Sequence, residues 1–154
     1  VVMTYGMTND VVFGRPFDRN KVAEDFQKVL VDELVPYVDS HFRTKADKKN
    51  RAMAGLSMGG METHSITLAR PETFGHYGIL SGGVYTPEEI KDKNQVDYIF
   101  ISCGSKEWPD RVLKSVADLK AAGFNAESYV SEGTAHEFLT WRRSLYMMAQ
   151  KLFK

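Results

Sequence analysis

The chain has 154 residues, and its 20 Lys and Arg residues balance its 20 Asp and Glu residues to a net charge of zero. This length predicts a single domain over residues 1–154, and the absence of a block of one charge argues against nucleic-acid and anionic membrane partners. Cys103 is the only cysteine, which excludes a disulfide framework or a thiolate metal cluster within one chain. No apolar run approaches the roughly 20 residues of a membrane span.

The N-terminal part predicts a strand, a loop and a helix. Residues 1–5, VVMTY, are typical of a buried strand, and a loop rich in Gly, Asn, Asp and Pro covers 6–20. Asn20 suits the N-cap of a helix, because apolar residues recur at helical spacing after it. We expect this helix to end near His41.

Strands and helices alternate along the rest of the chain. Further strands are predicted at 51–56, 76–81, 97–103 and 126–131. Further helices are predicted at 58–70, at 109–122 and after His136, the last with an apolar stripe of Phe138, Trp141, Leu145, Met148 and Leu152. Pro71, Pro109 and Gly123 mark helix ends. The order predicts an α/β fold, with a mainly parallel sheet and helices on both faces.

Ser57 lies in the motif Gly55-Leu56-Ser57-Met58-Gly59, between a predicted strand and a predicted helix. This pattern matches the nucleophile elbow, in which a sharp turn presents a serine hydroxyl at the carboxyl edge of a sheet. Glycine at 55 and 59 fits the motif, because a side chain at either position would crowd the strand against the helix. The alternative is a glycine-rich turn without chemistry, and the flanking strand and helix favour the nucleophile.

A serine nucleophile needs a base, and the base needs an orienting acid. His136 is the candidate base, because its loop follows the last strand and lies at the same sheet edge; the other three histidines are expected at the surface or in packing. Glu107 and Asp110 follow the strand at 97–103, and either could orient the imidazole. Choosing Glu107 gives the Ser, acid, His order of α/β-hydrolases. The Met58 N–H, at a helix N-terminus, is the candidate oxyanion donor.

Longer segments extend these motifs over nearly the whole chain, namely DELVPYVDSHFRTKADKKNRAMAGLSMGGMET, FGHYGILSGG, CGSKE and GTAHEFLTWRRSL. They resemble the esterase family that includes esterase D, the enterochelin esterases and the feruloyl esterases of carbohydrate esterase family one. The resemblance implies an α/β-hydrolase fold, no metal or cofactor, Ser57 as nucleophile, His136 as base and Met58 as oxyanion donor. Family members usually carry aspartate where Glu107 stands and glutamine where Glu62 stands.

The resemblance also implies that residues 1–5 form the fourth strand of the family fold. We therefore expect the first three strands, and the loop with the second oxyanion donor, to precede Val1. On this interpretation the chain is the C-terminal part of a longer esterase domain. A separate N-terminal segment is the other possibility.

The HEFLTWRRSL ending most resembles the feruloyl esterases. It implies a serine carboxylesterase that acts on hydroxycinnamoyl esters of plant xylan, with a tethered glycanase as a possible partner and a secreted or periplasmic location. Trp108 and Trp141 are candidate aromatic contacts for the acyl group. Core packing is the equal alternative for Trp108 and the favoured role for Trp141. The competing functions are an acetyl-xylan or siderophore esterase and a non-catalytic carbohydrate-binding or interaction relative.

Overall fold

The computed structural model of the chain describes residues 1–8, 16 and 18–154. The chain divides into two compact units, Val1–Ala46 and Asp47–Lys154. All residues of the candidate site lie in the second unit. The single domain expected over 1–154 stays a prediction.

The first unit is mainly one helical segment. It runs through α1 (Arg19–Lys28), a π-helical stretch (Val29–Leu34) and α2 (Val35–His41). Pro36, in the first turn of α2, has no N–H to donate, which suits the change from π- to α-helical bonding at this point. The predicted helix ending near His41 is confirmed, whereas the side chain of Asn20 and most of the predicted loop at 6–20 lie outside the described residues.

The strand predicted at 1–5 is wrong. These residues form no strand, and their side chains are exposed. A strand needs a neighbour for its backbone N–H and C=O groups, and none of the strands in the described ranges pairs with this segment. The apolar run is therefore not sufficient to make a strand without a pairing partner.

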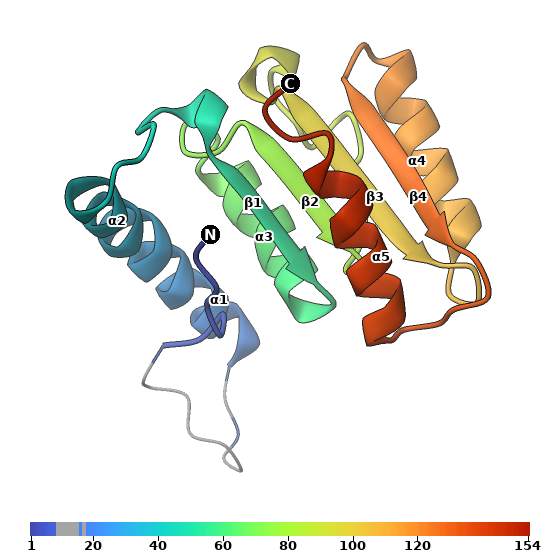
Figure 1. Cartoon of the computed structure of the whole chain (residues 1–154), viewed down its shortest axis with the longest axis horizontal. Coiled ribbons are helices and arrows are strands. Elements are labelled where there is room, and N and C mark those ends of the chain that lie inside the picture. Colours follow the sequence, from blue (N-terminus) through green and yellow to red (C-terminus); the bar gives the residue numbers. More distant parts are fainter. Residues whose placement is uncertain (9–15, 17) are drawn as a thin grey trace. The chain divides into compact units, whose positions relative to one another are not determined.

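The second unit contains a four-stranded parallel sheet in the order β1-β2-β3-β4 (Figure 1). Its strands are β1 (Ala52–Leu56), β2 (His76–Leu80), β3 (Tyr98–Gly104) and β4 (Ala126–Ser131). Every residue of β2 and β3 is buried, as expected for central strands covered on both faces. The strands predicted from 51 onward are confirmed.

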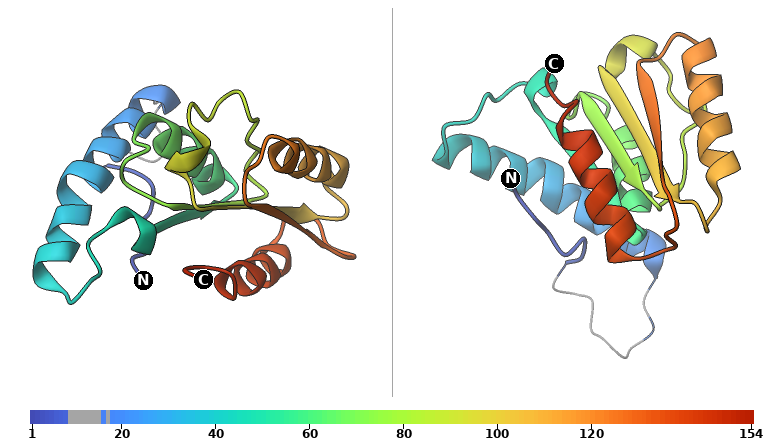
Figure 2. Two further views of the ribbon diagram at one scale, coloured as in Figure 1. Left: turned by 90° about the horizontal axis from the view of Figure 1, so that it is seen from above. Right: turned by 45° about the vertical axis from the view of Figure 1, so that its right-hand side comes forward.

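Helices cover both faces of the sheet, as predicted. The left view of Figure 2 shows α3 (Met58–Ala69) and α4 (Pro109–Ala121) on one face and α5 (Phe138–Ala149) on the other. Short 3-10 turns occupy Lys48–Asn50 and Lys93–Gln95. Gly78 allows α5 to pack closely, because a Cβ there would lie 2.5 Å from the Met148 sulfur.

The apolar stripe predicted on the last helix is only partly buried. Met148 is fully buried beside Leu80, Tyr98 and Phe100, and Trp141 and Leu152 pack against this cluster. In contrast, Phe138 is 78% exposed and Leu145 is 50% exposed. The buried residues of α5 are instead Met148 and two small polar residues, Thr140 and Ser144.

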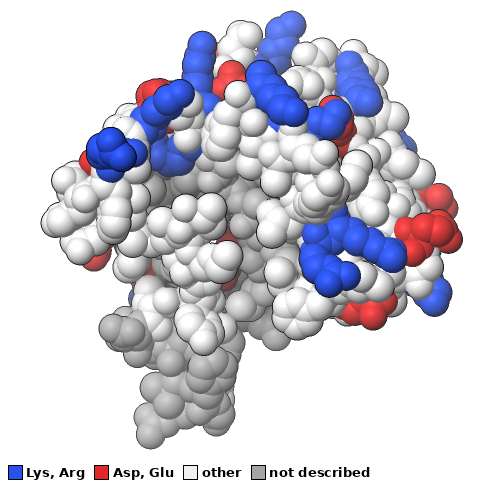
Figure 3. Space-filling model, viewed as in Figure 1, with Lys and Arg blue, Asp and Glu red and all other residues white. Residues whose placement is uncertain are grey.

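Neither the surface charge nor the hydropathy of the helices identifies a binding site in the described part of the chain. On the face shown in Figure 3, Asp and Glu side chains interrupt the Lys and Arg side chains. None of the described helices is long and apolar enough to cross a membrane. Among the described side chains, no cluster of His, Cys, Asp and Glu has the arrangement of a metal site.

Candidate active site

Ser57 lies on a sharp turn between β1 and α3. Its φ of 52° and ψ of −116° lie in a region that non-glycine residues rarely adopt. The Ser57 N–H donates to the Leu80 carbonyl of the neighbouring strand at 2.9 Å, and its own carbonyl accepts from the N–H groups of Gly60 and Met61. These bonds hold the strained backbone in place, so the hydroxyl projects from the carboxyl edge of the sheet.

Close backbone contacts surround this turn. A Cβ on Gly55 would lie 1.9 Å from the Gly59 carbonyl oxygen, which confirms that this position excludes a side chain. The same expectation for Gly59 is wrong, because a Cβ there would meet no described atom within 4 Å. Gly60 is the crowded position, since its Cβ would lie 2.7 Å from the Gly82 Cα. The turn after β2 thus packs directly against the first turn of α3.

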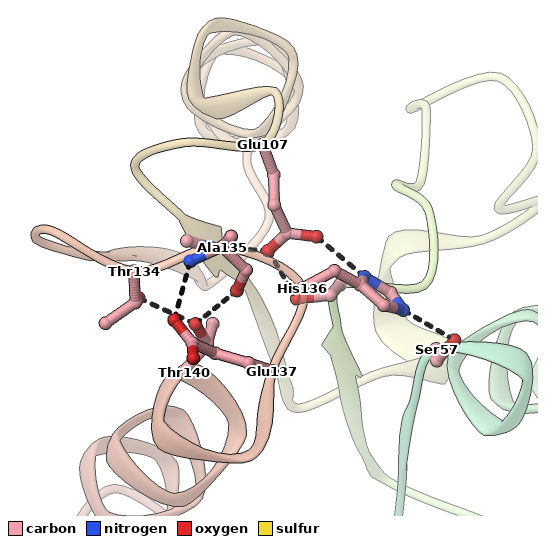
Figure 4. Close-up of polar contacts among 9 residues, drawn as sticks. Ser57, Glu107, Thr134, Ala135, His136, Glu137 and Thr140 are labelled. Carbon is pink, nitrogen blue, oxygen red and sulfur yellow. Dashed lines mark hydrogen bonds and ion pairs between the residues drawn. The ribbon is translucent and has the colours of Figure 1, made fainter.

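The structure brings Ser57, His136 and Glu107 together through two hydrogen bonds (Figure 4). His136 Nε2 lies 2.8 Å from Ser57 Oγ, and His136 Nδ1 lies 2.8 Å from Glu107 Oε1. A carboxylate only accepts, so Nδ1 carries the proton and Nε2 accepts from the serine hydroxyl. This tautomer is the one in which imidazole can take a proton from the serine.

Glu107 is almost completely enclosed, with 5% of its side chain exposed, whereas 47% of the His136 side chain is exposed. Burial alone would raise the pKa of Glu107. The Gly104 N–H, His136 and the Ser81 hydroxyl all donate to the carboxylate and outweigh burial, so the Glu107 pKa lies below its ordinary value. The carboxylate is therefore charged at neutral pH and can stabilise a protonated imidazole.

Hydrogen bonds from α5 hold the loop that carries His136 (Figure 4). The Thr140 hydroxyl lies 2.5 Å from the Ala135 carbonyl oxygen and 2.6 Å from the Thr134 hydroxyl, which itself donates to the Ser131 carbonyl. The Ala135 N–H donates to the Glu137 carboxylate at 3.1 Å. These contacts fix the backbone on both sides of His136.

The loops after β3 and β4 are also tied to each other. The Lys106 N–H donates to the Thr134 carbonyl at 3.0 Å, and the Ser105 N–H donates to the Ser131 carbonyl at 2.9 Å. A Cβ on Gly104 would lie 2.4 Å from the Thr134 carbonyl oxygen, so the two backbones are in contact. The separation between Glu107 and His136 is therefore set by backbone packing.

The other predicted site residues lie nearby but contribute differently. Met58 begins α3, where the first N–H groups of a helix have no intrahelical acceptor and can face an anion. Asp110 is exposed in the first turn of α4, and Glu107 rather than Asp110 contacts His136. Trp108 is half-buried, with the Arg111 guanidinium 5.7 Å from its ring centre. Its role as a substrate contact stays a prediction.

Sequence reasoning missed two contacts with the site. Trp141 meets the His136 ring edge to face, with ring centres 5.1 Å apart, besides its expected packing in the core. Ser81 donates to Glu107, although only its place directly after β2 could have indicated it. Neither contact has a sequence motif, because each joins segments that are far apart in the chain.

An apolar groove of about 520 Å³ lies on the α5 face of the sheet. It is lined by Leu56, Leu80, Phe138, Leu139, Trp141, Arg142 and Leu145. Leu56 directly precedes Ser57, and Trp141 contacts His136, so the groove begins beside the hydrogen-bonded pair.

Comparison with known sequences supports an esterase relationship. The family model described as "Putative esterase" matches residues 1–142. A curated relative from Xylanibacter ruminicola, named endo-1,4-beta-xylanase/feruloyl esterase, is 66% identical over all 154 residues of this chain. The chain spans 21% of the length of that relative.

Solved structures share the fold at low sequence identity. A ferulic acid esterase from Anaeromyces mucronatus, in complex with ferulic acid, matches with a TM-score of 0.72 and 18% identity, over 94% of this chain and 60% of that one. An S-formylglutathione hydrolase from Staphylococcus aureus matches with a TM-score of 0.62 and 13% identity, over 86% of this chain and 66% of that one. The chain therefore has an α/β-hydrolase fold. It belongs to the esterase family whose model matches residues 1–142.

Proposed function

We propose that this chain carries the ester-hydrolysing centre of a feruloyl esterase, in which Ser57 is the nucleophile, His136 the base and Glu107 the orienting acid. The observation that carries the proposal is the pair of 2.8 Å hydrogen bonds from Glu107 through His136 to a serine on a strained turn. Nucleophile, base and orienting group in this geometry are the requirements of covalent acyl transfer.

The reaction follows from the protonation states. Ser57 Oγ attacks the ester carbonyl carbon while its proton passes to His136 Nε2, and the negative Glu107 carboxylate stabilises the resulting imidazolium. The Met58 N–H, at the N-terminus of α3, donates to the carbonyl oxygen as it becomes negative. His136 then protonates the departing alcohol, and an acyl group remains on Ser57. Water activated by His136 hydrolyses this acyl-enzyme and restores the serine.

The proposed substrate class is a hydroxycinnamoyl ester attached to plant xylan. Support comes from the name of the 66% identical relative, a xylanase and feruloyl esterase, of which this chain spans a part. A tethered glycanase would supply the xylan-degrading activity of such a protein. Because xylan is an extracellular polymer, we also propose a secreted or periplasmic location.

Labelling with a fluorophosphonate probe tests the nucleophile. We expect one adduct on Ser57, and none in Ser57→Ala or when the protein is unfolded before labelling. Absence of an adduct on the folded protein would favour the non-catalytic carbohydrate-binding relative.

Comparing esters then tests the substrate class. We expect the protein to release ferulate from methyl ferulate and feruloylated xylan faster than acetate from acetylated xylan. Faster release of acetate, or of fragments from a siderophore lactone, would replace the feruloyl proposal with the corresponding esterase.

A further inference from the structure

Ser81 contacts the site, and the mechanism above does not use it. It directly follows β2, as Ser57 directly follows β1, and it is 4% exposed. Its hydroxyl donates to Glu107 Oε2 at 2.8 Å, and the Gly104 N–H donates to the same oxygen at 2.6 Å. The other oxygen, Oε1, is the one that accepts from His136. The two carboxylate oxygens thus have separate partners.

The backbone fixes the direction of the Ser81 hydroxyl. Ser81 has a φ of 52°, a conformation that costs free energy for serine and persists only when its surroundings hold it. The Ser81 N–H donates to the Ser102 carbonyl at 2.8 Å. Next to it, a Cβ on Gly82 would lie 2.5 Å from both the Ser57 carbonyl oxygen and the Gly60 Cα, so the chain has little freedom to take another path.

A glutamate needs this restraint more than an aspartate does, because its additional rotatable bond gives the carboxylate more orientations. Two donors on Oε2 remove that freedom and leave Oε1 directed at the imidazole. We propose that Ser81 is a positioning residue, whose hydroxyl holds Glu107 Oε2 so that Oε1 keeps His136 in the orientation and tautomer that the reaction requires. This inference rests on the proposed function and adds a residue that acts only through Glu107.

Proton NMR tests the positioning without depending on activity. The His136 Nδ1–H should give a downfield signal, assigned by its loss in Glu107→Ala. We expect this signal to broaden by faster exchange with water in both Ser81→Ala and Ser81→Gly. Ser102→Ala is a matched control, since it removes a buried serine hydroxyl that has no hydrogen-bond partner, and the signal should stay sharp. An unchanged signal in both Ser81 variants would overturn the proposal.

Kinetics then tests the consequence for the reaction. Hydrogen bonds to charged groups contribute enough that we expect kcat to fall about 10- to 100-fold in Ser81→Ala, with KM within about 2-fold of the unmodified protein. Ser81→Gly should show the same fall in kcat as Ser81→Ala. It should be at least as stable as Ser81→Ala, because glycine accepts a positive φ without strain. If kcat followed the melting temperature of these two variants, Ser81 would be a structural residue and the proposal would fail.

A double-mutant cycle separates positioning from other effects. In a Glu107→Ala background, Ser81→Ala should change kcat by less than about 2-fold, because the group through which Ser81 acts is gone. A full additional loss in that background would show that Ser81 acts independently of Glu107. Failure of the proposed function is a different result, namely full activity in Ser57→Ala, and it leaves the NMR outcome intact.

Discussion

The substitution Glu107→Gln tests the orienting role of this residue with almost no change of shape. Oε2 of Glu107 accepts from both the Ser81 hydroxyl and the Gly104 N–H. A glutamine would place its carbonyl oxygen at this position, because an amide NH2 cannot accept from two donors. Its NH2 would then face His136 Nδ1 and donate to it. The imidazole proton would move to Nε2, where it blocks acceptance of the Ser57 proton.

The expected loss follows from this change of tautomer. The equivalent amide substitution in a serine protease triad lowers kcat by about 10⁴, which corresponds to about 5.5 kcal/mol. Glu107→Asp keeps the charge but is shorter by one methylene, so it loses contact either with His136 or with the donors to Oε2. Losing one hydrogen bond to a charged group gives a smaller fall, about 10- to 100-fold. Glu107→Gln should therefore be the more damaging variant.

Steady-state kinetics on methyl ferulate, together with the rate of fluorophosphonate labelling, measures both variants. Circular dichroism and the melting temperature show whether each remains folded. The reasoning is refuted if Glu107→Gln retains more than about a tenth of the original kcat, or if Glu107→Asp is the weaker enzyme. Asp110→Ala is a suitable control, because Asp110 is exposed and should leave kcat unchanged.

Four further substitutions have expected outcomes in thermal unfolding. Gly60→Ala should destabilise the fold by about 1–3 kcal/mol, because the new Cβ would clash with the turn after β2. Gly59→Ala should be neutral or should stabilise α3 by up to about 1 kcal/mol. Equal changes in stability for the two variants would contradict the close contact between Gly60 and Gly82. Burial raises the pKa of Glu62 to about 7, so the fold should lose stability as the pH rises from about 4.5 through 7. Glu62→Gln should remove about 1–2 kcal/mol of this loss, a figure discounted because Glu62 is half-exposed. A difference in stability between Glu62→Gln and the unmodified protein that persists at pH 4 would count against this explanation. Thr140→Val should cost about 1–3 kcal/mol, because the Ala135 carbonyl loses its donor, and a melting temperature equal to that of the unmodified protein would show that this carbonyl is satisfied elsewhere.

Much of the second unit could be predicted from its sequence, because local patterns determine it. Buried apolar runs identified the strands, and Pro109 and Gly123 correctly marked the ends of α4. The sheet edge at which Ser57, Glu107 and His136 meet also followed from simple topology, since parallel strands place their carboxyl ends together. Their catalytic roles remain predictions that the variants above test.

What could not be predicted depends on contacts between distant segments. The apolar run at 1–5 satisfied the pattern of a strand, but a strand also requires a neighbour that the pattern does not specify. The motif likewise drew attention to Gly59, whereas the close approach of Gly82 makes Gly60 the restricted position. The contacts of Ser81 with Glu107 and of Trp141 with His136 were missed for the same reason, because they form only when distant segments come together.

The resemblance to the esterase family leads us to expect aspartate where Glu107 stands, and the surroundings of Glu107 explain how it can serve as the acid. A longer side chain in an open loop would sample several orientations, and few of them would reach the imidazole. Here the carboxylate is enclosed, one oxygen is held by Ser81 and Gly104, and the loop itself is bonded to the His136 loop through Lys106. The extra methylene therefore places Oε1 within 2.8 Å of His136 Nδ1 instead of disordering it. It follows that restoring aspartate alone should weaken the site, since the donors are spaced for the longer side chain.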